Sequence, residues 1–142
     1  MIDVRAAVRA YLAAQAGIIA QVSTRVYGAP GIPREDALLM PRKALAFYAS
    51  GGPGADRYVP EAHGNIQFRC YGATSLEAGV VYAALYDALH RKHHIRLTGD
   101  MLILTIEESM APTDMVEPAT GWPFVMCVYD VHYVTQTVAE AA

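Results

Sequence analysis

The sequence predicts an α+β fold: a four-stranded, mainly antiparallel sheet made from two hairpins, with two helices packed on one face, in the order αββαββ. Two segments carry apolar residues at helical spacing, and four carry the alternating, β-branched or aromatic residues typical of strands. At 142 residues, the chain fits a single domain (1–142) that can bury a core without disulfides or a structural metal.

The first helix is predicted to begin near Asp3, an acid suited to a helix N-terminus, and to end at Gly17. The apolar stretch 18–22 that follows is ambiguous, and the segment 28–33, Gly-Ala-Pro-Gly-Ile-Pro, is typical of a turn-rich connection. The buried stripe of this helix follows the i, i+3, i+4 spacing and comprises Val4, Ala7, Val8, Tyr11 and Leu12.

The first hairpin is predicted from two strand-like segments on either side of a glycine-rich loop. Residues 44–49 are aliphatic and aromatic, and Ile66, Phe68 and Cys70 alternate with polar neighbours. Between the strands, residues 50–63 contain too much glycine for a regular element, so we expect a long loop there.

The second helix is predicted to begin at a capping box, Thr74-Ser75-Leu76-Glu77, in which the threonine side chain accepts a hydrogen bond from the amide of Glu77. We expect it to end in the basic run 90–94, where cations favour the negative end of the helix dipole. Its predicted buried stripe comprises Ala78, Val81, Tyr82, Leu85, Ala88 and Leu89.

The second hairpin is predicted from strands over 101–107 and 123–137, the latter with the long β-branched and aromatic alternation of a central strand. The connection 109–121 contains two prolines and is expected to be a loop. Because connections of this length are uncommon without a function, both long loops are candidate contact regions.

Composition and charge exclude several classes of protein. The chain is 54% hydrophobic and 18% charged, with a net charge of −3, which argues against a dedicated nucleic-acid binder. The longest uncharged stretch is too short and too polar for a membrane span, and the N-terminus does not resemble a secretory signal, so we expect a protein made in a cytosol. Cys70 and Cys127 lack metal or redox spacing and are expected to be buried free thiols.

Three histidines, His90, His93 and His94, form the first candidate metal site, because imidazoles at i and i+3 or i+4 on a helix can share a metal ion. Neighbouring Arg91 and Lys92 oppose cation binding. The favoured interpretation is therefore a basic helix end that faces solvent or an acidic partner.

A second candidate is an acid/base set. Asp130 and His132 alternate onto one face of the last strand, and His63 could join them in a small metal- or ligand-binding enzyme. No nucleophile in a recognisable elbow accompanies them, and such residues more often face solvent or a neighbouring subunit. The enzyme stays a rival hypothesis.

Other charged or glycine-rich clusters match no known site. The acids of the second long loop do not have the spacing of a calcium-binding loop, so we expect a solvated acidic loop there; they are Glu107, Glu108, Asp114 and Glu117. The glycines at 51–54 lack the phosphate-binding pattern and suit a loop that orders on a partner. Acids intervene among the bases near the first hairpin, which favours a mixed-charge interface over a nucleic-acid groove; the bases are Arg34, Arg42, Lys43 and Arg57.

Two segments carry a resemblance to a known family. They are Arg25-Val26-Tyr27-Gly28-Ala29-Pro30, which follows the first helix, and the strand, glycine and capped helix that begin with Ile66-Gln67-Phe68-Arg69-Cys70-Tyr71-Gly72-Ala73-Thr74-Ser75-Leu76-Glu77-Ala78. In this order, spanning most of the chain, they resemble the tail-completion or tail-terminator proteins of long-tailed bacteriophages and gene transfer agents.

The resemblance implies a structural role with no active site, metal or cofactor. It implies a hexameric ring of this chain at the head-proximal end of the tail tube, in the neck of a virion or phage-like particle assembled in the bacterial cytoplasm. The implied partners are the tail tube protein and the head–tail connector or stopper protein, with DNA passing through the lumen and no membrane involved. Another neck or tail-tube ring component (adaptor, stopper or tube subunit) is the alternative with the same build.

The two long loops and the apolar residues outside the predicted core are the expected interface. Arg57 and Tyr58 lie in the first loop, and Tyr48 on the outer face of its strand. Aromatic residues are frequent anchors of protein interfaces, so Tyr58 and Trp122 are candidates. The second loop region contributes Met110, Met115, Val116 and Trp122.

Overall fold

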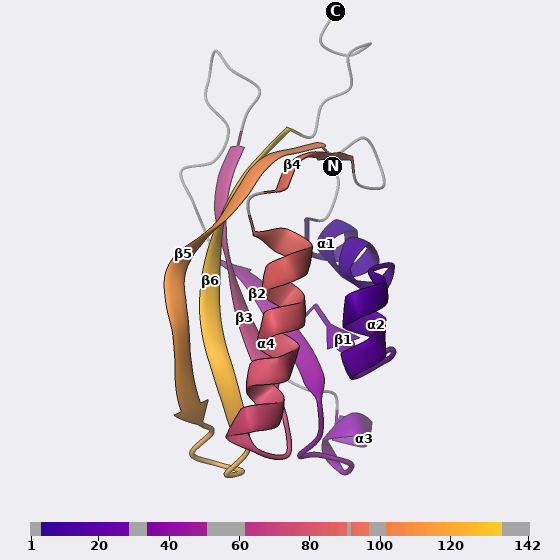
Figure 1. Ribbon diagram of the computed structural model, residues 1–142, viewed down its shortest axis with the longest axis vertical. Helices are drawn as coiled ribbons and strands as arrows, with labels where there is room; N and C mark the ends of the chain where they lie inside the picture. Colours follow the sequence, from indigo (N-terminus) through magenta and orange to yellow (C-terminus); the bar gives the residue numbers. More distant parts are fainter. Residues whose placement is uncertain (1–3, 29–33, 51–61, 91, 97–101, 135–142) are drawn as a thin grey trace, which may run out of the picture.

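The computed structural model describes residues 4–28, 34–50, 62–90, 92–96 and 102–134 (Figure 1). The helices are α1 (Val4–Ala13), α2 (Ala16–Val22), α3 (Arg34–Ala37) and α4 (Ser75–Leu89). The strands are β1 (Val26–Tyr27), β2 (Ala44–Ser50), β3 (Ala62–Tyr71), β4 (Lys92–Arg96), β5 (Leu102–Val116) and β6 (Pro123–Val134). Within these ranges the strands form one sheet in the order β1-β2-β3-β6-β5-β4.

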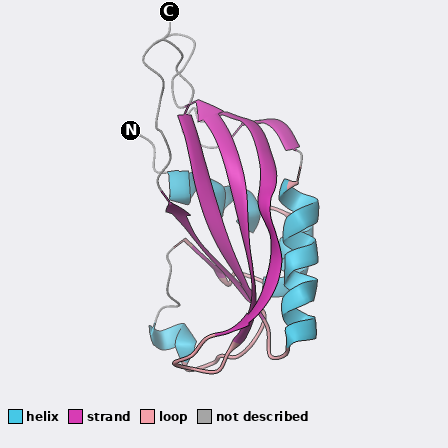
Figure 2. Ribbon diagram, turned by 90° about the vertical axis from the view of Figure 1, so that its left-hand side faces the viewer, coloured by secondary structure: helices cyan, strands magenta, loops and turns pink. Residues whose placement is uncertain are grey.

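The sheet is mainly antiparallel and carries its long helices on one face, as Figure 2 shows for α4. Only β1 and β2 pair in parallel. The hairpins β2–β3 and β5–β6 join through β3 and β6, which makes these two strands the centre of the sheet. The predicted α+β class, the two hairpins and the central position of the last strand are confirmed.

The main core lies between this face and the helices α1, α2 and α4. Side chains of β3 alternate, so Ile66, Phe68 and Cys70 all point toward the helices. The Phe68 ring lies between Phe47, at 5.6 Å between centroids, and Tyr129, at 5.5 Å with an edge-on approach. Burial of each such ring stabilises the fold by roughly 1.5–3 kcal/mol, so this layer supplies much of its stability.

The connection from β3 to α4 allows almost no free space. A Cβ on Gly72 would overlap the backbone nitrogen of Ala78 and lie 2.7 Å from Cβ of Glu77, so a glycine is required by close approach. The Thr74 hydroxyl accepts from the amide of Glu77 at 3.3 Å, which confirms this part of the capping box. Together they fix where α4 begins.

The predicted order αββαββ is wrong before the first hairpin and again after α4, where β4 is an additional strand, and the described sheet has six strands where four were predicted. The first helix ends at Ala13, and Gly17 lies inside α2 instead of ending α1. Ile18 and Val22, four residues apart, both bury against the core, which explains why a separate short helix forms there. The structure also adds the strand β1 and the single turn α3, while Asp3 and residues 29–33 lie outside the described residues.

The predicted basic helix end over 90–94 is also wrong. Helix α4 stops at Leu89, and His90 already has an extended backbone. Residues from Lys92 onward form β4, in which Ile95 pairs with Ile103 of β5. Strand pairing and burial of apolar side chains outweigh the small dipole term on which the prediction rested.

The predicted loop 109–121 is mostly strand. Strand β5 continues to Val116 in register with β6, through irregularities between Glu108 and Met110 and between Met110 and Thr113. These bulges accommodate Pro112, which has no amide hydrogen to donate. Most of the other long loop, 50–63, lies outside the described residues, although Ser50 and His63 belong to β2 and β3.

Candidate assembly interface

The sheet face opposite α4 carries an ordered layer of half-buried side chains. The Tyr48 hydroxyl donates to the Gln67 side-chain oxygen, and Gln67 Nε2 lies 2.7 Å from the Met126 sulfur. These three residues come from neighbouring strands, β2, β3 and β6. Tyr48 is thus hydrogen-bonded within the chain and half-buried.

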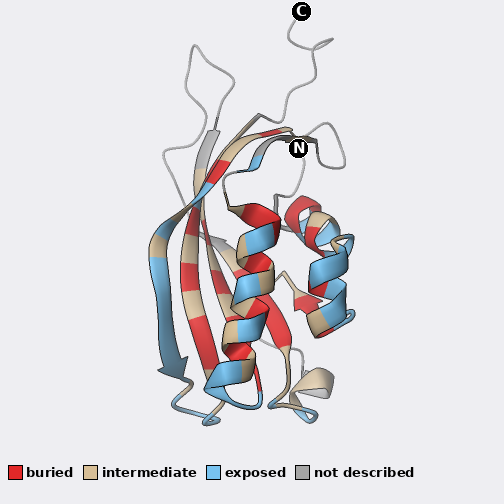
Figure 3. Cartoon of the chain, viewed as in Figure 1, coloured by how far each residue is buried: buried red, intermediate tan, exposed pale blue. Residues whose placement is uncertain are grey.

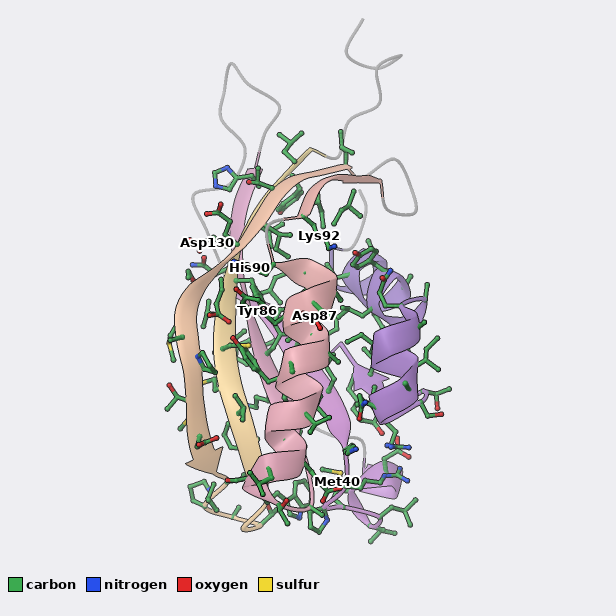
Figure 4. The ribbon with its side chains drawn as sticks, viewed as in Figure 1. Met40, Tyr86, Asp87, His90, Lys92 and Asp130 are labelled. Atoms are coloured by element: carbon green, nitrogen blue, oxygen red, sulfur yellow. The ribbon has the colours of Figure 1, made fainter. Side chains whose placement is uncertain are left out.

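A second, smaller apolar cluster lies on this face. Ala44, Ala46, Tyr71 and Phe124 are buried there, beneath four half-buried side chains from flanking segments: Tyr27, Met40, Trp122 and Met126. Figure 4 labels Met40 beside α3, at the lower end of the molecule. Side chains of the same chain therefore cover this end of the face, and they come from β1, the segment after α3, the β5–β6 turn and β6.

Trp122 belongs to this cover. Its ring meets Tyr71 edge-on, with 6.1 Å between centroids, and Tyr71 in turn contacts Phe124 at 5.5 Å. The Tyr71 hydroxyl donates to the Glu117 carboxylate at 3.2 Å. Burial raises the pKa of Tyr71 above its usual value, although Arg69 opposes this shift, so the phenol stays protonated at neutral pH and keeps this hydrogen bond.

Strand β5 divides into a covered half and an exposed half (Figure 3). Strand β4 pairs with it only as far as Ile106, so from Glu107 to Val116 its outer edge has no partner strand among the described residues. Met115 is 40% and Val116 61% exposed, whereas Met110 is half-buried. Exposed apolar residues on an open edge are typical of an interaction surface.

The exposed large apolar side chains concentrate at one end of the subunit, where α3, the start of α4 and the β5–β6 turn lie (Figure 1). Five of the seven that the described residues contain are there: Leu38, Leu39, Leu76, Met115 and Val116. The sequence prediction identified the two on β5 and missed the three leucines. The pair Leu38-Leu39, placed between two prolines outside any strong periodicity, is a signal that could have identified them.

The structure brings together three of the six predicted interface residues. Met115 and Val116 pair with the first residues of β6, and Trp122 accepts a backbone hydrogen bond from the Glu117 amide at 2.9 Å across the turn. Met110 lies several residues farther up, opposite Val128. Arg57 and Tyr58 lie outside the described residues.

The residues of the rival enzyme hypothesis are neighbours in the sheet. His63 of β3 pairs with His132 of β6, and Asp130, on the same face as His132, is exposed opposite Asn65. In the part of the chain that the structure describes, no group of three His, Cys, Asp or Glu residues could hold a metal ion.

The three histidines of the first candidate metal site do not lie on one helix. His90 stacks on Tyr86 of α4 with 4.3 Å between ring centroids, while His93 and His94 belong to β4.

Cys70 and Cys127 are buried free thiols, as predicted. Burial raises the pKa of Cys70 well above its usual value, so its thiol stays protonated and unreactive.

Comparison of the structure with known proteins finds a similar fold, whereas comparison of the sequence finds no family. No family model matches the chain, and no curated protein does. The fold is shared with a virion chain. That chain belongs to the structure "Virion of native gene transfer agent (GTA) particle", with a TM-score of 0.64, 18% sequence identity, and coverage of 92% of this chain and 94% of that one.

The likeness therefore covers nearly the full length of both chains. At 18% identity it is a likeness of fold. No helix in the described ranges is long and apolar enough to cross a membrane.

Proposed function

We propose that this protein is a structural, non-enzymatic subunit of a phage-like particle: a tail terminator that forms a hexameric ring at the head-proximal end of the tail tube. In this position it ends tube polymerisation and joins the tail to the head connector or stopper protein. DNA passes through the lumen of the ring without specific binding.

The observation that carries this proposal is the fold shared with a gene transfer agent virion chain over more than nine-tenths of both chains. The five exposed large apolar side chains at one end of the chain support it, because clustered exposed apolar residues are typical of surfaces that bind another protein. The motif from Ile66 to Ala78, on which the resemblance to tail terminators rests, forms β3, the tight turn at Gly72 and the start of α4.

The deciding experiment is electron microscopy of particles produced without this protein. A terminator sets tail length, so its loss should give overlong tails, or tails without heads. Tails of normal length joined to heads would contradict the proposal.

The same experiment distinguishes the other ring components. Loss of a tube subunit should leave no tails, and loss of an adaptor or stopper should leave tails of normal length that are unattached. Each of these outcomes would replace the terminator role with the corresponding alternative.

The enzyme hypothesis has one observation in its favour, the pairing of His63 with His132 beside Asp130. Replacement of all three residues with alanine tests it. We expect the variant to support normal tails and heads. Loss of particle function with intact assembly would favour an enzyme.

A further inference from the structure

Charge is distributed unevenly along the chain. All eleven Lys and Arg residues lie within residues 1–96, together with seven acids. Residues 97–142 contain the other seven acids and no Lys or Arg. The small net charge of the whole chain is therefore the sum of a basic first part and an acidic last part whose charges largely cancel.

The bases near β1 and the acids of β5 lie toward opposite edges of the sheet, while β4, which also belongs to the basic first part, pairs with the first half of β5. Strand β1 forms one edge, with α3 beside it, and β5 runs near the other, where only the short β4 lies outside it. Figure 1 shows α3 at the lower right of the molecule and β5 at its left. The bases near β1 and α3 are therefore separated across the sheet from the acids of β5.

We call the first margin the α3 flank, and define it by Arg25, Leu38, Leu39, Arg42 and Lys43. Two of these bases make hydrogen bonds within the chain: Arg25 Nε donates to the Lys43 carbonyl at 2.6 Å, and Lys43 Nζ donates to the Gln21 side-chain oxygen at 3.0 Å. Tyr27 interacts with both Arg42 and Asp36, the one acid whose side chain the structure describes beside them. Leu38 and Leu39, which precede Arg42 and Lys43 in the chain, are both exposed.

The opposite margin is the β5 flank, defined by Glu107, Asp114, Met115, Val116 and Glu117. Glu107 and Asp114 are exposed, and Glu117 is half-buried. The described base nearest in the sheet order is Lys92 of β4, and β4 pairs only with the part of β5 that ends at Ile106. This flank therefore combines acids with an exposed apolar pair.

The two flanks are complementary in both respects. Each has a pair of exposed apolar side chains. The described charged residues of the first flank are mostly bases, and those of the second are acids. Neither flank can pair with a copy of itself without bringing like charges together, which disfavours a two-fold symmetric contact. Two different, complementary patches on one chain generate a head-to-tail contact, and such a contact closes into a ring when its rotation allows.

We propose that the partner of the β5 flank is the α3 flank of a second copy of this chain. This deepens the proposed function, since it rests on a ring and names the surfaces that close it. The bulges of β5 and Pro112 oppose a continuous strand ladder across the contact, so side chains, and not added backbone pairing, make it.

Chemical cross-linking within assembled particles tests this contact. The variant L39C/V116C carries one exposed cysteine on each flank, and the native Cys70 and Cys127 are buried and protected from the reagent. A short bismaleimide should link it into a ladder of multimers on a denaturing gel. L39C and V116C alone are the matched controls and should give no multimers.

A ladder or dimer from either single-cysteine variant would show that the flank meets a copy of itself, and would overturn the proposal. Absence of a ladder from the double variant, in particles that contain the protein at the end of the tail, would also overturn it while leaving the terminator role intact. Particles that never contain the protein would instead contradict the proposed function.

Charge exchange supplies a second, independent test. L38D/L39D places acids opposite the acidic β5 flank, and D114K/V116K places bases opposite the basic α3 flank. Each variant should lose incorporation into particles. The variant with all four substitutions restores opposite charges across the contact and should regain it.

L76D is the matched control for this series, because Leu76 is 85% exposed, like Leu38 at 84%, but lies in α4 on neither flank. It should form the ring, measured by the same cross-linking ladder in an L39C/V116C background. Failure of the four-residue variant to regain incorporation, with each pair folded as judged by circular dichroism, would overturn the contact.

Discussion

The two halves of β5 show how one strand can serve two purposes. Its first half lies between β4 and β6 beneath the helices, and Ile103 and Ile106 are each only 1% exposed. Its second half keeps the pairing with β6 but loses the outer neighbour, and its last residue, Val116, is 61% exposed. Apolar side chains in the first half stabilise the subunit, while those in the second half are available to another molecule.

The largest expected effect belongs to the covered half. Ile106→Ala removes buried side-chain volume from the main core and should lower the free energy of unfolding by about 2–5 kcal/mol. Urea denaturation of the purified subunit measures this. A loss no greater than that of a surface substitution would remove the distinction between the halves.

Gly72→Ala should come next, because the added Cβ overlaps the Ala78 backbone where β3 meets α4. We expect a loss of about 1–3 kcal/mol in the same assay. Gly79→Ala is the matched control: a Cβ there meets nothing within 4 Å, and alanine in a helix interior should raise stability by roughly 0.5–1 kcal/mol. Equal effects of the two changes would contradict the packing described at Gly72.

Tyr129→Phe tests the effect of a single buried hydroxyl group in the main core. The Tyr129 hydroxyl is buried without a hydrogen-bond partner in the described structure, so its removal should leave stability at pH 7 unchanged or raise it by about 1 kcal/mol. Burial also raises the pKa of Tyr129 above its ordinary value of 10. Folding therefore favours the protonated phenol. The resulting contribution to the free energy of unfolding is fully present below pH 10 and decreases as the pH rises above 10.

Unfolding curves at increasing pH check this second effect. The wild type should lose stability above pH 10 more steeply than Tyr129→Phe. Parallel pH profiles for the two proteins would show that the phenol does not titrate differently on folding.

The smallest effect on stability is expected in the exposed half. Met115→Ser and Val116→Ser should each change the free energy of unfolding much less than Ile106→Ala, by about 0.5 kcal/mol for Val116, because both side chains are exposed at the end of the strand. Both should nevertheless reduce incorporation into particles, measured by quantitative immunoblotting of purified particles. A large stability loss with normal incorporation would reverse the assigned roles of the two halves.

Local patterns predicted the parts of the fold whose stabilising contacts are close in sequence. The capping residue Thr74 and the alternation around Phe68 identified α4 and β3, because helical and strand periodicity follow directly from side-chain positions. The end of α4 and the length of β5 depended instead on pairing between β4, β5 and β6. Such long-range pairing overrides the helix-dipole preference at 90–94 and the apparent loop character of Pro112.

The candidate interface, like the fold, could be predicted only in part from the sequence. Met115, Val116 and Trp122 could be identified as apolar residues outside any predicted core, but the partial burial of Trp122 against Tyr71 required the fold. Leu38 and Leu39 were missed because the segment between two prolines gives no periodicity to interpret. The separation of charge between the first 96 residues and the rest is visible in the sequence, yet the sequence alone does not show that β1 and β5 lie toward opposite edges of the sheet.

The most direct test of the central claim is a cryo-electron microscopy reconstruction of the tail–head junction of particles that contain this protein. We expect six copies of the chain in one ring between the end of the tail tube and the head connector, with the β5 flank of each copy against the α3 flank of the next. Density for the chain repeated along the tube, or its absence from the junction, would contradict it.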